Sequence, residues 1–101
     1  HHGTTNAVCM VAVLQFNRPV IEGLIERAAA YLSIDGGFEG FAAFVDQLNS
    51  SLGIPSNLGE LGVINPDLES LTRTALTDPC VGGNPVAMTP ENTRQLYENL
   101  L

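Results

Sequence analysis

The fold is decided by residues 4–33, which read TTNAVCMVAVLQFNRPVIEGLIERAAAYLS. In residues 4–17, apolar side chains cover most of the circumference of a helix. Pro19 suits the first turn of a second helix over residues 19–33, where apolar side chains recur at spacings of three and four. The pattern predicts two consecutive helices with Pro19 at the start of the second.

The first of these helices, which Thr4 or Thr5 can cap, is apolar on all sides. A helix of this kind is normally buried all round. A chain of 101 residues can hardly surround one helix, so we expect part of this surface to face protein that is missing from the chain. Its valines also permit a strand, but the length and the lack of alternation favour a helix.

A third helix is expected over residues 38–52, after a break at the Asp35-Gly36-Gly37 turn. Gly53 follows it as a natural C′ residue. The apolar side chains that fall on one face of this helix are Phe38, Phe41, Phe44, Val45, Leu48 and Leu52. Residues 54–64 are rich in glycine and proline and have room for one further turn, at residues 58–61.

Two start signals that contain proline predict the remaining helices, over residues 66–77 and 90–100. Asn65 caps the first and Thr89 the second, and a proline follows each cap at the first helical position. Residues 80–88 join the two as a loop. The expected fold is all-α, a bundle of about five helices without a convincing strand.

Composition and charge exclude several classes of function. Eleven acidic residues face four scattered arginines, for a formal net charge of −7. No basic stripe tracks a phosphate backbone or an anionic membrane surface, so we expect neither nucleic acid nor a membrane as partner. The longest apolar run, residues 7–14, is far shorter than the roughly 20 residues of a membrane span. Cys9 and Cys80 form no disulfide framework, which favours a reduced, cytoplasmic protein.

The only histidines, His1 and His2, are adjacent at the start of the chain. A catalytic metal needs at least three protein ligands, and two neighbouring histidines at a chain end do not provide them. On the residues alone, the pair is either the remnant of a tag or a native segment, and the tag or a solvated end is the simpler interpretation.

The second candidate is the glycine-rich loop that follows Pro79. Cys80 lies beside it with no histidine near in sequence, so the residue suits the lining of a pocket better than a nucleophile. Gly82 and Gly83 permit a close approach between backbone and ligand, although an ordinary interhelical loop is the simpler interpretation. The residues alone therefore assign no catalytic group.

Four motifs resemble those of the iron-containing alcohol dehydrogenases, in the order and spacing of that family. They are HGTTNA at residues 2–7 with FN at 16–17, LGIP at 52–55, LGELGV at 58–63, and DPCVGGNP at 78–85. The resemblance covers essentially all of the chain. It implies that residues 1–101 form the C-terminal helical domain of a dehydroquinate-synthase-like enzyme whose N-terminal NAD(P)-binding domain is absent from this sequence.

The resemblance implies hydride transfer between an alcohol, or the matching aldehyde or ketone, and NAD(P). A divalent metal, Fe²⁺ or Zn²⁺, acts as a Lewis acid in such enzymes and is held by one aspartate and three histidines. His2 matches the last of these histidines, which favours a native His2. Cys80, Gly82, Gly83 and Asn84 match the segment that lines the cofactor and substrate pocket.

The implied partners are the missing N-terminal domain, a small alcohol and, in a homodimer, a second copy. We expect the 101-residue chain to be inactive alone and to hold no cofactor by itself. An alternative from another class is a free-standing helical protein-interaction module, whose exposed apolar first helix would bind a partner.

Overall fold

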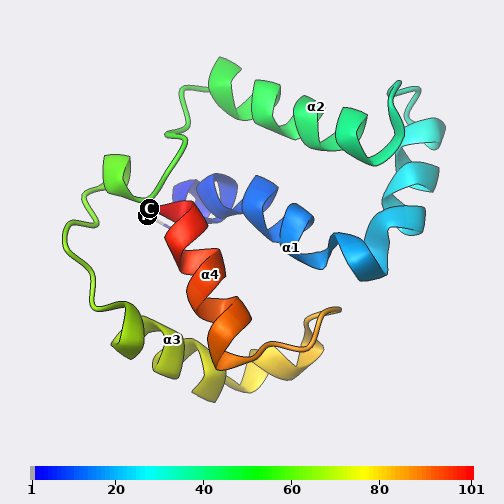
Figure 1. Ribbon diagram of the computed structural model, residues 1–101. Coiled ribbons are helices and arrows are strands. Elements are labelled where there is room, and N and C mark those ends of the chain that lie inside the picture. Colours follow the sequence, from blue (N-terminus) through cyan, green and yellow to red (C-terminus); the bar gives the residue numbers. More distant parts are fainter. Residues whose placement is uncertain (1) are drawn as a thin grey trace.

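A computed structural model of the chain describes residues 2–101, and all regular structure in this range is helical (Figure 1). The α-helices are α1 (His2–Tyr31), α2 (Gly37–Ser51), α3 (Leu68–Thr77) and α4 (Pro90–Leu100). Two short 3₁₀ helices, η1 (Gly59–Leu61) and η2 (Pro79–Gly83), lie between them. The all-α prediction is confirmed for the described residues, with four α-helices in place of about five.

Helix α1 corrects the prediction of separate helices over residues 4–17 and 19–33. It is one helix of 30 residues that continues through Pro19. Thr4 and Thr5 consequently lie inside the helix and do not cap it. Pro19 is exposed to solvent. The helix tolerates it because the turn that it distorts does not have to pack against another helix there.

Pro19 bends α1. Pro19 has no N–H to donate to the carbonyl of Gln15, and its ring crowds that carbonyl. Figure 1 shows the ribbon changing direction near the middle of the helix. A straight helix of this length would measure about 45 Å at ~1.5 Å per residue, whereas the longest dimension of the molecule is 41 Å.

Helices α1 and α2 both end in a Schellman motif. The C′ residues, Ser33 and Gly53, adopt left-handed conformations with φ of 60° and 72°. The next N–H in each motif donates to the carbonyl five residues earlier, at 2.8 Å for α1 and 2.9 Å for α2. The prediction of Gly53 at C′ is therefore confirmed, and Ser33 occupies a position that normally favours glycine.

The N-terminal caps of α3 and α4 differ in how well the sequence predicted them. Asp67, not Asn65, caps α3: its carboxylate accepts a hydrogen bond of 3.1 Å from the N–H of Ser70. The cap of α4 is Thr89, as predicted, and it forms a capping box with Asn92. Asp67 lies one residue inside the predicted start of the helix. Its side-chain oxygen reaches the free N–H groups of the first turn, so Asp67 caps α3 in place of Asn65.

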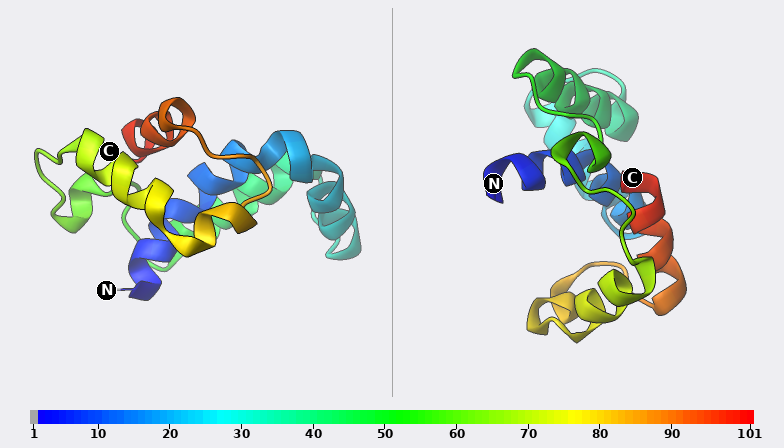
Figure 2. Two further views of the ribbon diagram at one scale, coloured as in Figure 1. Left: turned by 90° about the horizontal axis from the view of Figure 1, so that it is seen from below. Right: turned by 90° about the vertical axis from the view of Figure 1, so that its left-hand side faces the viewer.

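The helices pair in sequence order, α1 with α2 and α3 with α4, and α4 also packs on α1. In Figure 1 and in the right-hand view of Figure 2, α1 lies between α2 and the α3–α4 pair. The fully buried apolar residues are Val8, Ala29, Phe38, Ala42, Val45 and Leu100. This core is small, and it lies mainly where α1 meets α2 and the end of α4.

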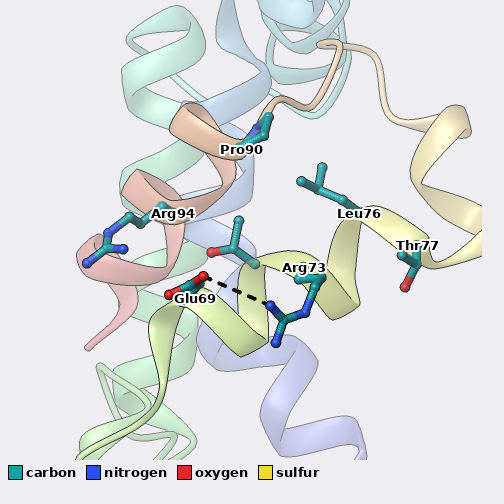
Figure 3. A pocket seen from close by; sticks show the side chains of 7 residues that line it. Glu69, Arg73, Leu76, Thr77, Pro90 and Arg94 are labelled. Atoms are coloured by element: carbon teal, nitrogen blue, oxygen red, sulfur yellow. Dashed lines mark ion pairs between the residues drawn. The ribbon is translucent and has the colours of Figure 1, made fainter.

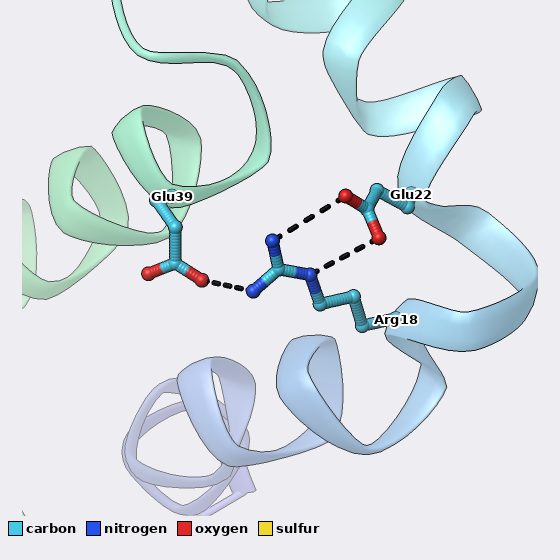
Figure 4. A network of polar contacts seen from close by, with 3 residues as sticks. All are labelled: Arg18, Glu22 and Glu39. Carbon is cyan, nitrogen blue, oxygen red and sulfur yellow. Dashed lines mark hydrogen bonds and ion pairs between the residues drawn. The ribbon is translucent and has the colours of Figure 1, made fainter.

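Arg18 ties the start of α2 to the middle of α1 (Figure 4). Its Nε and Nη2 donate to the carboxylate of Glu22 at 3.2 and 3.3 Å, and its Nη1 donates to Glu39 of α2. The guanidinium also lies 4.6 Å from the ring centre of Phe38, a cation–π contact. One side chain thus joins both helices close to the bend.

The turn between α1 and α2 requires glycine at position 40. A Cβ at Gly40 would lie 1.8 Å from the carbonyl oxygen of Asp35. Backbone atoms cannot give way as a flexible side chain can, so this close approach fixes how α2 leaves the turn.

Much apolar surface remains exposed. The predicted apolar face of α2 is only partly covered, since Phe44, Leu48 and Leu52 are 48%, 45% and 67% exposed. By length and composition α1 could cross a membrane, with a mean hydropathy of 1.4 and only 11% of its apolar window buried. A single such helix is weak evidence for a membrane span, because core helices of soluble proteins pass the same test.

Candidate functional site

The predicted loop over residues 80–88 borders a cavity of about 540 Å³. Its walls come from α3, from η2 with the segment after it, and from Tyr97 of α4. Of the four residues expected to line a pocket, Cys80 and Asn84 lie on this cavity, whereas Gly82 and Gly83 are exposed and lie outside its lining. The structure thus brings two of the four candidates together.

The loop begins as a 3₁₀ turn, which the sequence interpretation did not include. Asp78 caps it: the N–H of Cys80 donates to the Asp78 carboxylate at 2.7 Å, and Pro79 occupies the first position. A Cβ at Gly82 or Gly83 would meet nothing within 4 Å among the described residues. Neither glycine is therefore required by contacts inside this part of the chain.

A reciprocal pair of amides, Asn17 and Asn84, fastens the loop to α1. The Nδ2 of Asn17 donates to the Oδ1 of Asn84 at 3.0 Å, and the Nδ2 of Asn84 donates back to the Oδ1 of Asn17 at 2.7 Å. Asn17 is only 5% exposed. Sequence reasoning missed this residue, although it belongs to the FN pair at residues 16–17 that was noted as part of a motif.

Tyr97, which lines the cavity, lies near the thiol of Cys9. Burial raises the pKa of the Cys9 thiol; burial and, to a smaller extent, the nearby Cys9 raise the pKa of the Tyr97 phenol. Cys9 is half-buried in α1. Both groups are neutral near pH 7, so Cys9 has no thiolate character and Tyr97 can donate a hydrogen bond.

His2, the candidate metal ligand, lies exposed in the first turn of α1. The Nδ2 of Asn6 is 3.1 Å from the Nε2 of His2, one helical turn away. Within residues 2–101, no three or more histidine, cysteine, aspartate or glutamate residues gather as a metal site would require. These residues alone do not fit a metal, since they offer one imidazole; His1 lies outside the described residues.

Comparison with known proteins connects these features. Residues 1–101 match the family model described as Fe-containing alcohol dehydrogenase family, C-terminal. The chain belongs to this family. The helical fold described above is accordingly the C-terminal helical domain of an iron-type alcohol dehydrogenase, as the four motifs implied.

Three relatives show the range of named activities in this dehydrogenase family. Lactaldehyde reductase of Escherichia coli K12 is 30% identical over 95% of the chain. NAD-dependent methanol dehydrogenase of Bacillus methanolicus is 31% identical over 99%, and 4-hydroxybutyrate dehydrogenase of Cupriavidus necator is 31% identical over 97%. The chain spans only 27%, 28% and 26% of these three proteins. No solved structure matches it at a significant level.

The chain has a second cavity, of about 390 Å³, between α3 and α4 (Figure 3). Arg73 and Arg94 border it, but each already faces a carboxylate one helical turn away, at 4.0 Å for Glu69 and 3.3 Å for Glu98. The rest of the lining is largely apolar. Both arginines are partly neutralised, so the cavity does not form a site for an anion such as the cofactor phosphates.

Proposed function

We propose that the full-length protein that contains this chain is an NAD(P)-dependent alcohol dehydrogenase. The observation that carries the proposal is the family match, which extends over every residue of the chain. A hydride would leave the carbinol carbon of a small alcohol for the nicotinamide of NAD(P)⁺, and the hydroxyl proton would be released. The reverse reaction would reduce an aldehyde or ketone. The named relatives, which act on lactaldehyde, methanol and 4-hydroxybutyrate, favour a small substrate.

In this proposal, His2 supplies one ligand to a divalent metal and residues outside the chain supply the rest. When bound, the metal, Fe²⁺ or Zn²⁺, would polarise the substrate oxygen as a Lewis acid. The Asn6 amide lies within hydrogen-bond distance of the His2 ring and can restrict its rotation. The structure assigns no catalytic acid or base to this chain.

The loop residues Cys80, Gly82, Gly83 and Asn84 form one wall of the proposed substrate and cofactor pocket. Cys80 and Asn84 already face a cavity, together with Tyr97. The exposed glycines present bare backbone, which the remainder of the enzyme or the cofactor can approach closely. Cys80 then acts by its size and polarity, and we assign it no nucleophilic step.

The exposed apolar surface of α1 favours burial against other protein. We propose the N-terminal domain of the same enzyme as its main partner and a homodimer as a further one, with neither nucleic acid nor a membrane involved. The unpaired thiols Cys9 and Cys80 are consistent with a cytoplasmic enzyme. The family match makes an enzyme domain a better proposal than a free-standing interaction module.

The test compares full-length enzyme with and without the His2→Ala change. Loss of one of the metal ligands is expected to lower metal content several-fold and to lower turnover with alcohol and NAD(P)⁺ by at least about 10-fold. Inductively coupled plasma mass spectrometry measures the metal, and absorbance of the reduced nicotinamide measures turnover. His1→Ala is the neighbouring control and should change neither.

Two results would count against the proposal in different ways. A His2→Ala variant with full metal content and full turnover would refute the ligand assignment alone. Unmodified full-length protein that reduces no NAD(P)⁺ with any of a range of small alcohols, and oxidises no NAD(P)H with their aldehydes, would refute the activity itself. The 101-residue chain alone should be inactive, because it lacks the groups that hold nicotinamide and substrate in reacting geometry.

A further inference from the structure

The Asn17–Asn84 pair is a set of hydrogen bonds between α1 and the segment that follows η2. Besides the two reciprocal bonds, Asn84 donates to the carbonyl of Val86 at 2.8 Å, and the N–H of Val86 donates to Asn17 at 3.3 Å. The Asn17 side chain therefore makes three hydrogen bonds with groups that are 67 and 69 residues away in sequence. A buried amide that lost these partners would remain desolvated without compensation.

Few other contacts hold the loop. Helix η2 contains no buried residue, and Cys80 and Pro85 are exposed. Helix η2 contacts α3, and the Nδ2 of Asn92 in α4 donates to the carbonyl of Ala87 at 2.9 Å. The amide pair is the hydrogen-bonded link between the loop and α1.

Asn84 links this anchor to the cavity. One side chain both bonds to Asn17 and lines the cavity of about 540 Å³ beside Cys80. Any shift of Asn17 is therefore transmitted to the wall that carries Cys80. Asn17 lies on α1, the helix that begins with His2, so the same rigid element holds the loop and the proposed metal ligand.

We propose that Asn17 is a positioning residue that acts through Asn84 to set the cavity wall and thereby determines which alcohols fit. The inference deepens the proposed function and rests on it. Asn17 touches no reacting atom, so its replacement changes substrate selection and leaves the metal in place. A displaced wall should let a bulkier or longer alcohol bind better, whereas the preferred small alcohol should bind less well.

The experiment uses the full-length enzyme with Asn17→Ala, Asn84→Ala and the double variant. Asn17→Asp is a milder change that keeps the two accepted hydrogen bonds and loses the donated one. Asn49→Ala is the matched control: Asn49 also forms a half-buried amide bond to α1, donating to the carbonyl of Ala7 at 2.8 Å, but it does not touch the loop. Metal content, the KM for NAD(P)⁺, and kcat and KM for straight-chain alcohols of increasing length are measured for each.

Asn17→Ala is expected to raise the KM for the preferred alcohol by about tenfold and to flatten the chain-length profile. Metal content should stay at the original value. The KM of Asn17→Asp for the preferred alcohol should lie between that of the unmodified enzyme and that of Asn17→Ala. In the Asn84→Ala background, Asn17→Ala should raise the KM for the preferred alcohol by less than about a further twofold. Asn17 acts on the cavity through Asn84, and that side chain is already removed.

A second readout does not depend on turnover. In the full-length enzyme, where the proposed N-terminal domain would cover Cys80, iodoacetamide should alkylate this residue several-fold faster in Asn17→Ala and at an unchanged rate in Asn49→Ala; peptide mass spectrometry resolves Cys80 from Cys9. An unchanged rate together with an unchanged chain-length profile would overturn the inference, as would equal changes in Asn49→Ala. Unmodified enzyme without alcohol activity would refute the proposed function, and the alkylation rates would still decide whether Asn17 positions the loop.

Discussion

At the scale of the single residue, two buried threonines illustrate the difference between a satisfied and an unsatisfied polar group. Thr72 in α3 and Thr93 in α4 are 7% and 1% exposed. The hydroxyl of Thr93 lies 3.4 Å from the Asn92 amide oxygen, whereas the hydroxyl of Thr72 has no hydrogen-bond partner within residues 2–101. A buried hydroxyl without a partner lowers stability because water no longer solvates it.

We therefore expect opposite effects of the same substitution at these two sites. Thr72→Val should raise the free energy of unfolding by up to about 1 kcal/mol, since valine has nearly the same shape and no polar atom. Thr93→Val should lower it by about 1 kcal/mol, because a hydrogen bond is lost. Urea unfolding followed by circular dichroism measures both, and a Thr72→Val variant less stable than Thr93→Val would contradict the account.

Sequence reasoning reached the site residues unevenly for a physical reason. Cys80 and Asn84 stand out because a cysteine and a glycine pair interrupt a helical pattern. Asn17 does not, because its role comes from a partner 67 residues away, and no local rule predicts such a pairing. The motif at residues 16–17 drew attention to the position without revealing what the side chain does.

At the scale of the element, several helix ends were predictable and the bend was not. Caps such as Thr89 and stops such as Gly53 depend on interactions within a few residues, so local sequence determines them. Pro19 is compatible with either a helix start or a kink, and local sequence does not decide between the two. The apolar faces of α1 and α2 are only partly covered by this chain.

Gly40 and Gly23 differ in whether the fold leaves room for a Cβ, and a pair of alanine variants tests this difference. Gly40→Ala should lower the free energy of unfolding by about 2 kcal/mol or more, because a Cβ would overlap the Asp35 carbonyl and force the turn apart. Gly23→Ala should raise the free energy of unfolding by about 0.5–1 kcal/mol through helix propensity, because Gly23 is exposed and an added Cβ would meet no other part of the described residues within 4 Å.

Thermal unfolding of the two variants, monitored at 222 nm, measures these changes. Equal midpoints for Gly40→Ala and the unmodified protein would show that the turn adapts easily and that the close approach does not determine the angle between α1 and α2.

At the scale of the whole molecule, the dominant feature is apolar surface without cover. The molecule measures 41 × 30 × 19 Å, so its thinnest dimension holds few layers of side chains. Large side chains such as Leu24, Tyr31 and Leu52 are more than half exposed. Surface of this kind is typical of an interface, which agrees with a chain that spans about a quarter of its relatives.

The isolated 101-residue chain should consequently associate or bind a hydrophobic dye. Exposed apolar side chains gain free energy when a second copy or a dye removes them from water. Sedimentation velocity and 8-anilinonaphthalene-1-sulfonate fluorescence test this expectation. A compact monomer that leaves the dye fluorescence unchanged would show that the exposed surface of α1 needs no partner.

The arrangement of the helices also has a consequence for the order of folding. Two pairs of helices that are neighbours in sequence, α1–α2 and α3–α4, meet through α1 and α4. Contacts between sequence neighbours form fast because little loop entropy is lost, whereas the amide pair closes a loop of 67 residues. We expect each pair to form early and the contacts between the pairs, including that of Asn17 with Asn84, to form later. The loop over residues 80–88 would then be among the last parts of the domain to become ordered, and hydrogen exchange should find it among the first to open.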